Sequence, residues 1–275
     1  MDLSPAVQRT IAVKLFDLSG VRLAVRAALP LSLLLLWQIL SLDWPPSPQF
    51  ATPVGVLRAF GELLAKGRLQ AGALISIGRI LTAFALATLL GGSVGLLMGY
   101  FSVLDRWLGP LVHTLRSIAP YAWIPLVILW LGIGDAAVIS IVAYAAFFPM
   151  TVNAITGARN IDRNLVDAAH VLGASRLTLF GRVFFPAALP SLLVGARLAM
   201  GSAWIAIVAA ELASGSRATQ TAMGGLGQMM YIFYAYSINL NYIVACIITV
   251  GVLALLSDLL LGALYRRLAP WARGR

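Results

Sequence analysis

Charged side chains are scarce in this sequence. Lysine, arginine, aspartate and glutamate make up 11% of its 275 residues, whereas a soluble domain has about a quarter. Hydrophobic residues make up 60%, and the mean hydropathy is +0.91. So few polar side chains argue strongly against a water-facing surface and a soluble enzyme, and so many apolar ones exclude a disordered chain. The composition predicts an integral membrane protein.

Cysteine and histidine are scarce as well. Cys246 is the single cysteine, so the chain forms no internal disulfide, and His113 and His170 are the two histidines. A metal cluster is therefore not expected, and no nucleophile–base set stands out. The phosphate-binding pattern Gly-x4-Gly-Lys-Ser/Thr is absent from the sequence. We expect no catalytic residue, no metal and no cofactor in this chain.

Long apolar runs define the predicted fold class, an all-α polytopic membrane protein with about six spanning helices. Each run approaches the ~20 residues that a helix needs to cross the hydrocarbon layer, and none shows the alternation of a membrane strand. The predicted spans are Ala28–Leu42, Leu74–Gly99, Pro110–Leu131, Ala136–Gly157, Pro190–Leu212 and Leu240–Tyr265. The first run follows basic residues, as in a signal peptide. Asp43-Trp44-Pro45-Pro46 then follows without a cleavage site, so we expect a retained helix.

The net charge of +10 indicates topology rather than nucleic-acid binding, because the basic residues lie mostly between the apolar runs. With a cytoplasmic N-terminus, the outer segments hold Arg58, Lys66, Arg68 and Arg217. The inner segments hold Arg9, Lys14, Arg22, Arg26, Arg106, Arg116, Arg159, Arg163, Arg176, Arg182, Arg266, Arg267, Arg273 and Arg275. The excess of inner positive charge predicts both termini in the cytoplasm. We divide the chain into 1–70, with the N-terminal cytoplasmic segment, first span and outer loop, and a core of 71–270.

The longest cytoplasmic connection, residues 158–185 of this core, contains a short helix with clear ends. Asn164 is a good N-cap, which would place Asp167 at N3, where the helix dipole favours an anion. Gly173 is placed to end the helix at C′. Ser175 can start a second helical stretch, which Pro186 interrupts. A short helix with small apolar residues between two spans could transmit a push from a cytoplasmic partner.

This connection resembles a known family. Asp167-Ala-Ala-x3-Gly173, then nine residues and Val183-x-Phe185-Pro186, resembles the EAA loop of ABC-importer permeases, with Asp, Val and Phe in place of Glu, Ile and Leu. Further fragments resemble the nitrate/sulfonate/taurine branch: Ser76-Ile-Gly-Arg79, Arg116–Leu126, Trp130–Gly134, Gly195–Leu198, Ala203-Trp204, Ala210-Glu211 and Gly224–Gly227. The resemblance covers roughly residues 45–270.

The resemblance implies the type I ABC importer permease fold, in a multi-pass protein of the bacterial inner membrane. It also implies a cytoplasmic ABC ATPase dimer, a periplasmic solute-binding protein and a second permease copy as partners, besides membrane lipid. The solute would be a small anion such as nitrate, sulfonate or taurine, and ATP would be hydrolysed on a separate chain. The residues that would couple to the ATPase are Asp167, Ala168, Ala169, His170, Gly173, Ala174, Ser175 and Pro186.

Three charged residues, Arg79, Arg197 and Glu211, fall within predicted spans. An intramembrane charge costs roughly 2.5–3.5 kcal/mol or more unless it is paired or wet. These residues therefore either line a translocation path for an anion or form buried ion pairs. A stripe of glycines, Gly91–Gly99, allows close packing of one helix on another, within the chain or between two permease copies.

A stand-alone secondary transporter or channel is the alternative function. An ion-coupled carrier would more often show inverted repeats with broken helices and buried acidic groups. Few acidic residues lie in the predicted spans, and the cytoplasmic connection indicates a partner protein.

Overall fold

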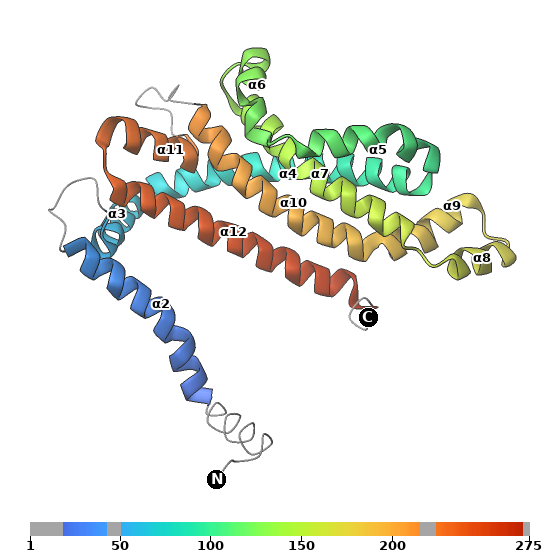
Figure 1. Cartoon of the computed structure of the whole chain (residues 1–275), viewed down its shortest axis with the longest axis horizontal. Coiled ribbons are helices and arrows are strands. Elements are labelled where there is room, and N and C mark those ends of the chain that lie inside the picture. The colour runs from blue at the N-terminus through green and yellow to red at the C-terminus, as the bar shows by residue number, and fades with distance from the viewer. Residues whose placement is uncertain (1–18, 43–50, 215–223, 272–275) are drawn as a thin grey trace, which may run out of the picture.

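The computed structural model describes residues 19–42, 51–214 and 224–271, and every regular element in these ranges is helical. Figure 1 shows an elongated bundle of long helices with short helices at both ends. Four helical stretches are long and apolar enough to cross a membrane: α4 (Arg68–Tyr100), α7 (Asp135–Arg159), Phe180–Ala213, which includes α10 (Phe185–Ala213), and α12 (Leu240–Leu268). They confirm four of the six predicted spans.

The third predicted span, Pro110–Leu131, is wrong as a single helix. The chain forms α5 (Ser102–Ser117), a short 3₁₀ turn at Pro120–Trp123 and α6 (Ile124–Leu131), and the two halves meet at 88°. Ala119 is extended, with φ −61° and ψ 133°, because the ring of the following Pro120 disfavours the helical conformation there. The pair counts as a spanning segment only if its bent halves are taken together.

The first predicted span belongs to α2 (Ser19–Leu42), which begins before the predicted start. Within α2, the apolar stretch Leu31–Ser41 is shorter than the helices that are long enough to cross a membrane. Figure 1 shows α2 leaving the bundle at a steep angle. The described leucines between residues 31 and 40 are exposed along this helix.

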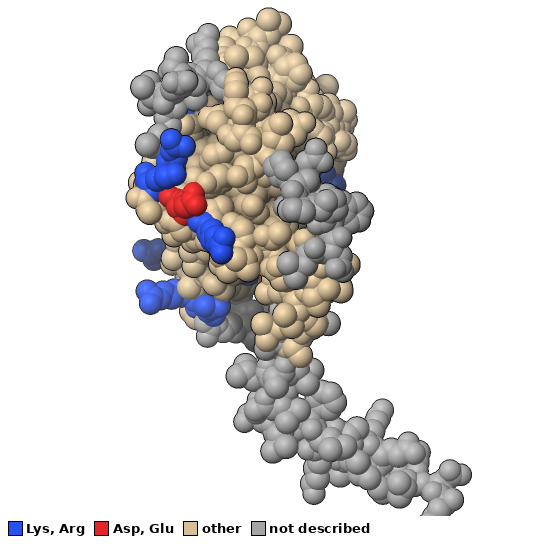
Figure 2. Space-filling model, turned by 90° about the vertical axis from the view of Figure 1, so that its left-hand side faces the viewer, with Lys and Arg blue, Asp and Glu red and all other residues tan. Residues whose placement is uncertain are grey.

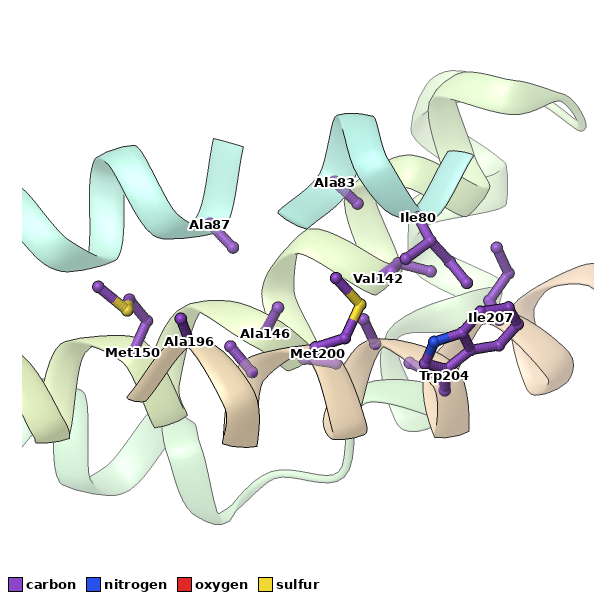
Figure 3. Close-up of a cluster of buried hydrophobic side chains, with 14 of the residues drawn as sticks. Ile80, Ala83, Ala87, Val142, Ala146, Met150, Ala196, Met200, Trp204 and Ile207 are labelled. Carbon is purple, nitrogen blue, oxygen red and sulfur yellow. The ribbon is translucent and has the colours of Figure 1, made fainter. Parts of the chain in front are cut away.

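The core lies where α4, α7 and α10 meet, and it is built largely from alanine. Ala83 of α4, Ala146 of α7 and Ala199 of α10 are completely buried. Figure 3 shows larger side chains, such as Met200 and Trp204, filling the spaces between these small residues. Lipid tails are as apolar as the core, so close packing of small residues must supply the attraction between the helices.

The glycine stripe of α4 is buried against α7 of the same chain. A Cβ at Gly95 would lie 2.4 Å from the carbonyl oxygen of Thr151, and one at Gly99 would lie 2.3 Å from the Cβ of Ala158. Gly91 likewise approaches the backbone of Phe147. The stripe thus makes a contact between two helices of the same chain. It does not provide the alternative contact between two copies of the chain.

Two short helices close the end of the bundle opposite the connection at residues 158–185: α3 (Pro53–Ala65) and α11 (Leu226–Ile232), which a π-helical turn at Phe233–Ser237 extends. Thr52 caps α3, because its hydroxyl accepts a hydrogen bond from the Gly55 N–H at 3.0 Å. Asn241 of α12 accepts from the Thr52 N–H at 3.1 Å. Figure 2 shows this end, where a few charged side chains lie on a mostly uncharged surface.

We predict that Gly95→Val destabilises the protein, because the new side chain would push α4 away from α7. Overpacking of this kind costs about 1–3 kcal/mol. The measurement is the thermal unfolding midpoint of the purified protein in detergent. Gly78→Val on the same helix is the control, since open space surrounds Gly78. Equal unfolding midpoints for the two variants would contradict the proposed importance of this contact.

Candidate functional site

The helix of the connection at residues 158–185 is α8 (Arg163–Val171). Its N-cap is Asp162, whose carboxylate accepts a hydrogen bond from the Asn164 N–H at 2.9 Å. The predicted Asn164 cap is therefore wrong, since a carboxylate two residues earlier satisfies the same end of the helix. As a result, Asp167 lies two residues further into the helix than the predicted N3 position.

Gly173 ends α8 as predicted. It has a positive φ of 74°, and its N–H donates to the His170 carbonyl at 2.9 Å. The Ala174 N–H donates to the Ala169 carbonyl at 3.0 Å. These two bonds form a Schellman motif, which favours glycine at the left-handed position. Ser175 then starts α9 (Arg176–Leu179), because its hydroxyl accepts from the Thr178 N–H.

The surface of α8 exposes apolar side chains. Leu165 is 54% exposed, and Val171 and Leu172 at the end of the helix are 88% and 85% exposed. Asp167 and His170 are exposed too, and Ala169 is partly covered. Figure 1 shows α8 and α9 projecting beyond the ends of the long helices. The predicted coupling residues thus lie on a protruding element with uncovered apolar side chains.

Pro186 does not interrupt the helical stretch that begins after Ser175, contrary to the sequence-based expectation. A π-helical turn, Phe180–Phe184, joins α9 to α10 without a break, and Pro186 occupies the first turn of α10. The Phe185 N–H reaches back to the Phe180 carbonyl. The wider π turn accommodates the proline ring and its missing N–H at a helix junction. Pro190 also lies inside α10, so the predicted start of the fifth span at this residue is too late.

A buried carboxylate, Glu211, organises the opposite end of the bundle. Its side chain is 1% exposed and pairs with Arg79, with Nη1 2.7 Å from Oε1. The Gly227 N–H donates to Oε2 at 2.8 Å, and the Ser76 hydroxyl lies 3.0 Å from both carboxylate oxygens. Ser76 in turn accepts from the Leu226 N–H. This network fixes the start of α11 to α4 and α10.

Two glycines of the Gly224–Gly227 fragment are required by this carboxylate. A Cβ at Gly225 would lie 1.9 Å from Oε1 of Glu211, and one at Gly227 would lie 2.7 Å from the Cβ of Glu211. Neither position has room for a side chain. The fragments Ala210-Glu211 and Gly224–Gly227, separate in the sequence, therefore form one structural unit. Residues 215–223, which include Arg217, lie outside the described residues.

Both arginines singled out in the sequence are paired with carboxylates. Besides Glu211, Arg79 binds Asp135 at the start of α7, with Nη2 2.6 Å from Oδ1. Arg197 makes two hydrogen bonds to Asp258 of α12, at 2.9 and 2.7 Å. With all groups ionised, the first cluster carries a net charge of −1 and the second of 0. Neither cluster offers a surplus positive charge to an anion.

Sequence reasoning missed several partners in these networks. Ser76 was visible only as part of a motif fragment, and Asp135 and Asp258 gave no signal of their pairing. Arg116, predicted among the charges of the inner segments, lies in the last turn of α5. Its neighbour Leu115 accepts a hydrogen bond from the Tyr144 hydroxyl of α7 at 2.6 Å. The position of Arg116 could be predicted only with knowledge of the bend at Pro120.

We predict that Gly225→Ala lowers the thermal stability of the protein, because the added methyl group would displace the carboxylate of Glu211. The expected cost is about 1–3 kcal/mol from overpacking and weakened hydrogen bonds. Thermal unfolding in detergent measures it. Gly251→Ala in α12, where open space surrounds the glycine, should leave stability unchanged or raise it. An equal midpoint for Gly225→Ala and the native chain would show that the loop does not depend on this contact.

Comparison with known proteins agrees with this geometry. Residues 87–270 match the family described as "Binding-protein-dependent transport system inner membrane component". A putative aliphatic sulfonates transport permease protein of Escherichia coli is 36% identical over 248 residues, which are 88% of this chain and 90% of that protein. A bicarbonate transport system permease protein of Synechocystis is 30% identical over 250 residues, covering 87% of this chain and 86% of that protein.

A solved inward-facing structure of the MetNI methionine ABC transporter has the same fold, with a TM-score of 0.62 at 19% identity. The match covers 74% of this chain and 97% of the solved one. These matches confirm the fold class and the family that the connection at residues 158–185 resembles. The chain therefore belongs to the binding-protein-dependent transport system inner membrane components, as a multi-pass ABC-importer permease of the nitrate/sulfonate/taurine branch.

Proposed function

We propose that this permease carries a small anion, such as nitrate, a sulfonate or taurine, into the cell. The relatives named for aliphatic sulfonates and bicarbonate support an anionic solute. A periplasmic binding protein delivers the solute to two copies of the chain, which form a homodimer around the path in the membrane. A cytoplasmic ABC ATPase dimer, on separate chains, supplies the energy. Both termini of the permease lie in the cytoplasm.

The observation that carries this proposal is the form of α8. A helix that exposes Val171 and Leu172 almost completely leaves apolar surface in water unless another protein covers it. Its capped ends make it rigid, so it can transmit force when a partner moves. Asp167, Ala168, Ala169 and His170 lie on this helix, and Gly173, Ala174 and Ser175 form its end. Pro186 begins the long helix through which the displacement enters the membrane.

In energetic terms the permease is a two-state element. ATP binding draws the two ATPases together, and the coupling helices bias the permease toward one state by their differential contacts. Selectivity for the solute resides mostly in the binding protein. Arg79, Arg197 and Glu211 act in this scheme by holding helices together, since each arginine is neutralised by a carboxylate.

We predict that transport needs the complete complex. Vesicles that contain the permease, the ATPase and the binding protein should take up nitrate, taurine or methanesulfonate only with ATP, as measured with isotopically labelled solute. Vesicles with the permease alone should show background uptake, because this chain has no phosphate-binding loop. ATP-independent uptake by the permease alone would favour the alternative, a stand-alone secondary transporter or channel.

We also predict that Leu172→Asp weakens ATPase binding at least about tenfold, since a carboxylate would be placed in an apolar contact. Leu172 is exposed in the isolated chain, so the permease should fold normally and show an unchanged unfolding midpoint. The measurement is the affinity of the ATPase dimer for permease in detergent. Leu129→Asp is the matched control, because Leu129 of α6 is 79% exposed and lies away from α8. Identical ATPase affinity for the two variants would reject the docking role.

A further inference from the structure

A cavity of about 480 Å³ lies between the end of α5, the following 3₁₀ turn and the facing sides of α7 and α10. Its volume is typical of a small-molecule site. Aromatic side chains, including Tyr121 and Phe148, form part of its wall, and Asn153 and Ser202 contribute polar groups. Arg116 is the one charged residue among those that line it.

The depth of Arg116 in the bundle follows from an ion pair near the α8 end. Asp105 in the first turn of α5 pairs with Arg159 in the last turn of α7. Arg116 lies eleven positions after Asp105, about 16 Å along the helix axis. The hydrocarbon layer is ~30 Å thick. With the Asp105–Arg159 pair at the edge of this layer, Arg116 lies close to its middle.

The contact with α7 also places Arg116 inside this layer. Tyr144, which also lines the cavity, binds the carbonyl of Leu115. Tyr144 lies fifteen positions before Arg159, about 22 Å along α7. Both helices therefore place the guanidinium group well inside the membrane-spanning part of the bundle.

Arg116 differs from the other membrane arginines because no carboxylate of the described residues pairs with it. The ion pairs among the described residues involve Arg79, Arg159 and Arg197 but not Arg116. Its side chain is exposed. An uncompensated charge at this depth is unfavourable unless it faces a wet path, and such residues mark routes for ions.

We propose that Arg116 is the fixed positive charge that the transported anion meets halfway across the membrane. The inference rests on the proposed function, and it moves the anion contact from Arg79 and Arg197 to this residue. The planar guanidinium can bind two oxygens of a sulfonate, nitrate or bicarbonate at once. Asn153 and Ser202 line the same cavity, and the aromatic wall suits the apolar part of a small organic anion.

Thiol labelling tests the charge of the cavity without knowledge of the solute. The background is the reconstituted importer complex with Cys246→Ala, which removes the single native thiol, and Ser202→Cys, which introduces one in the cavity wall. The rates of reaction with an anionic and a cationic methanethiosulfonate are compared. Arg116→Gln should lower the anion-to-cation rate ratio about tenfold, because a unit charge a few ångströms away acts in opposite directions on the two reagents.

Matched variants separate this effect from a general loss of positive charge. Arg116→Lys should keep most of the ratio, and Arg106→Gln, on the same helix near the α8 end, should leave it unchanged. An unchanged ratio in Arg116→Gln, or an equal fall in Arg106→Gln, would overturn the inference.

Uptake of nitrate, taurine and methanesulfonate in the native Cys246 background gives the second measurement. Arg116→Gln should reduce ATP-dependent uptake at least about tenfold, with Arg116→Lys retaining more activity and ATPase affinity the same in all variants. Native rates of uptake in Arg116→Gln would overturn the transport role. If the native complex imports none of these anions while the labelling ratio still depends on Arg116, the proposed function fails and the anion-attracting cavity stands.

Discussion

The close approach of α4 to α7 is the contact on which the rest of the structure depends. Gly91, Gly95 and Gly99 bring the two backbones together, and α10 completes the core through alanines. Water cannot drive these helices together inside a bilayer, so the packing of small residues has to do so. Both functional regions are attached to this core. The connection with α8 joins α7 to α10 at one end, and the Glu211 network joins α4, α10 and α11 at the other.

The pairing of charges shows how such a core can hold polar residues. Glu211 is nearly inaccessible, yet Arg79, Ser76 and the Gly227 N–H satisfy it. A half-satisfied network would be worse than an apolar one. The glycines beside it let the backbone N–H of Gly227 reach the carboxylate, and neither Gly225 nor Gly227 has room for a side chain. These pairs connect helices that lie far apart in the sequence. Their hydrogen bonds have a preferred geometry and so fix how the helices are oriented, which non-directional apolar packing does not.

The sequence predicts the apolar helices and the C-terminal end of α8 well, because these depend on local patterns: hydropathy, and a glycine placed just after the helix. The sequence predicts poorly whether a given proline interrupts a helix. Pro110, Pro149 and Pro190 lie inside helices, whereas Pro120 follows a sharp bend. The same local signal thus has different outcomes, since neighbouring helices decide whether freed backbone groups find partners.

The sequence did not predict the ion pairs between distant residues either. Arg197 and Asp258 are 61 residues apart and meet only because α10 and α12 pack together.

Helix α10 connects the two ends of the molecule and can transmit a displacement between them. It begins beside the π turn that follows the coupling connection, lines the cavity with Ser202 and ends at Glu211. A 29-residue α-helix is about 44 Å long, so it can carry a displacement through the whole membrane as a nearly rigid rod. The π turn and the two prolines near its start are the positions where its backbone hydrogen bonding is weakest. Movement at α8 would therefore change the tilt of α10 relative to α7, and the cavity between these two helices would open or narrow with it. Arg116, which pairs with no carboxylate in the described part of the chain, would then be exposed to each side of the membrane in turn.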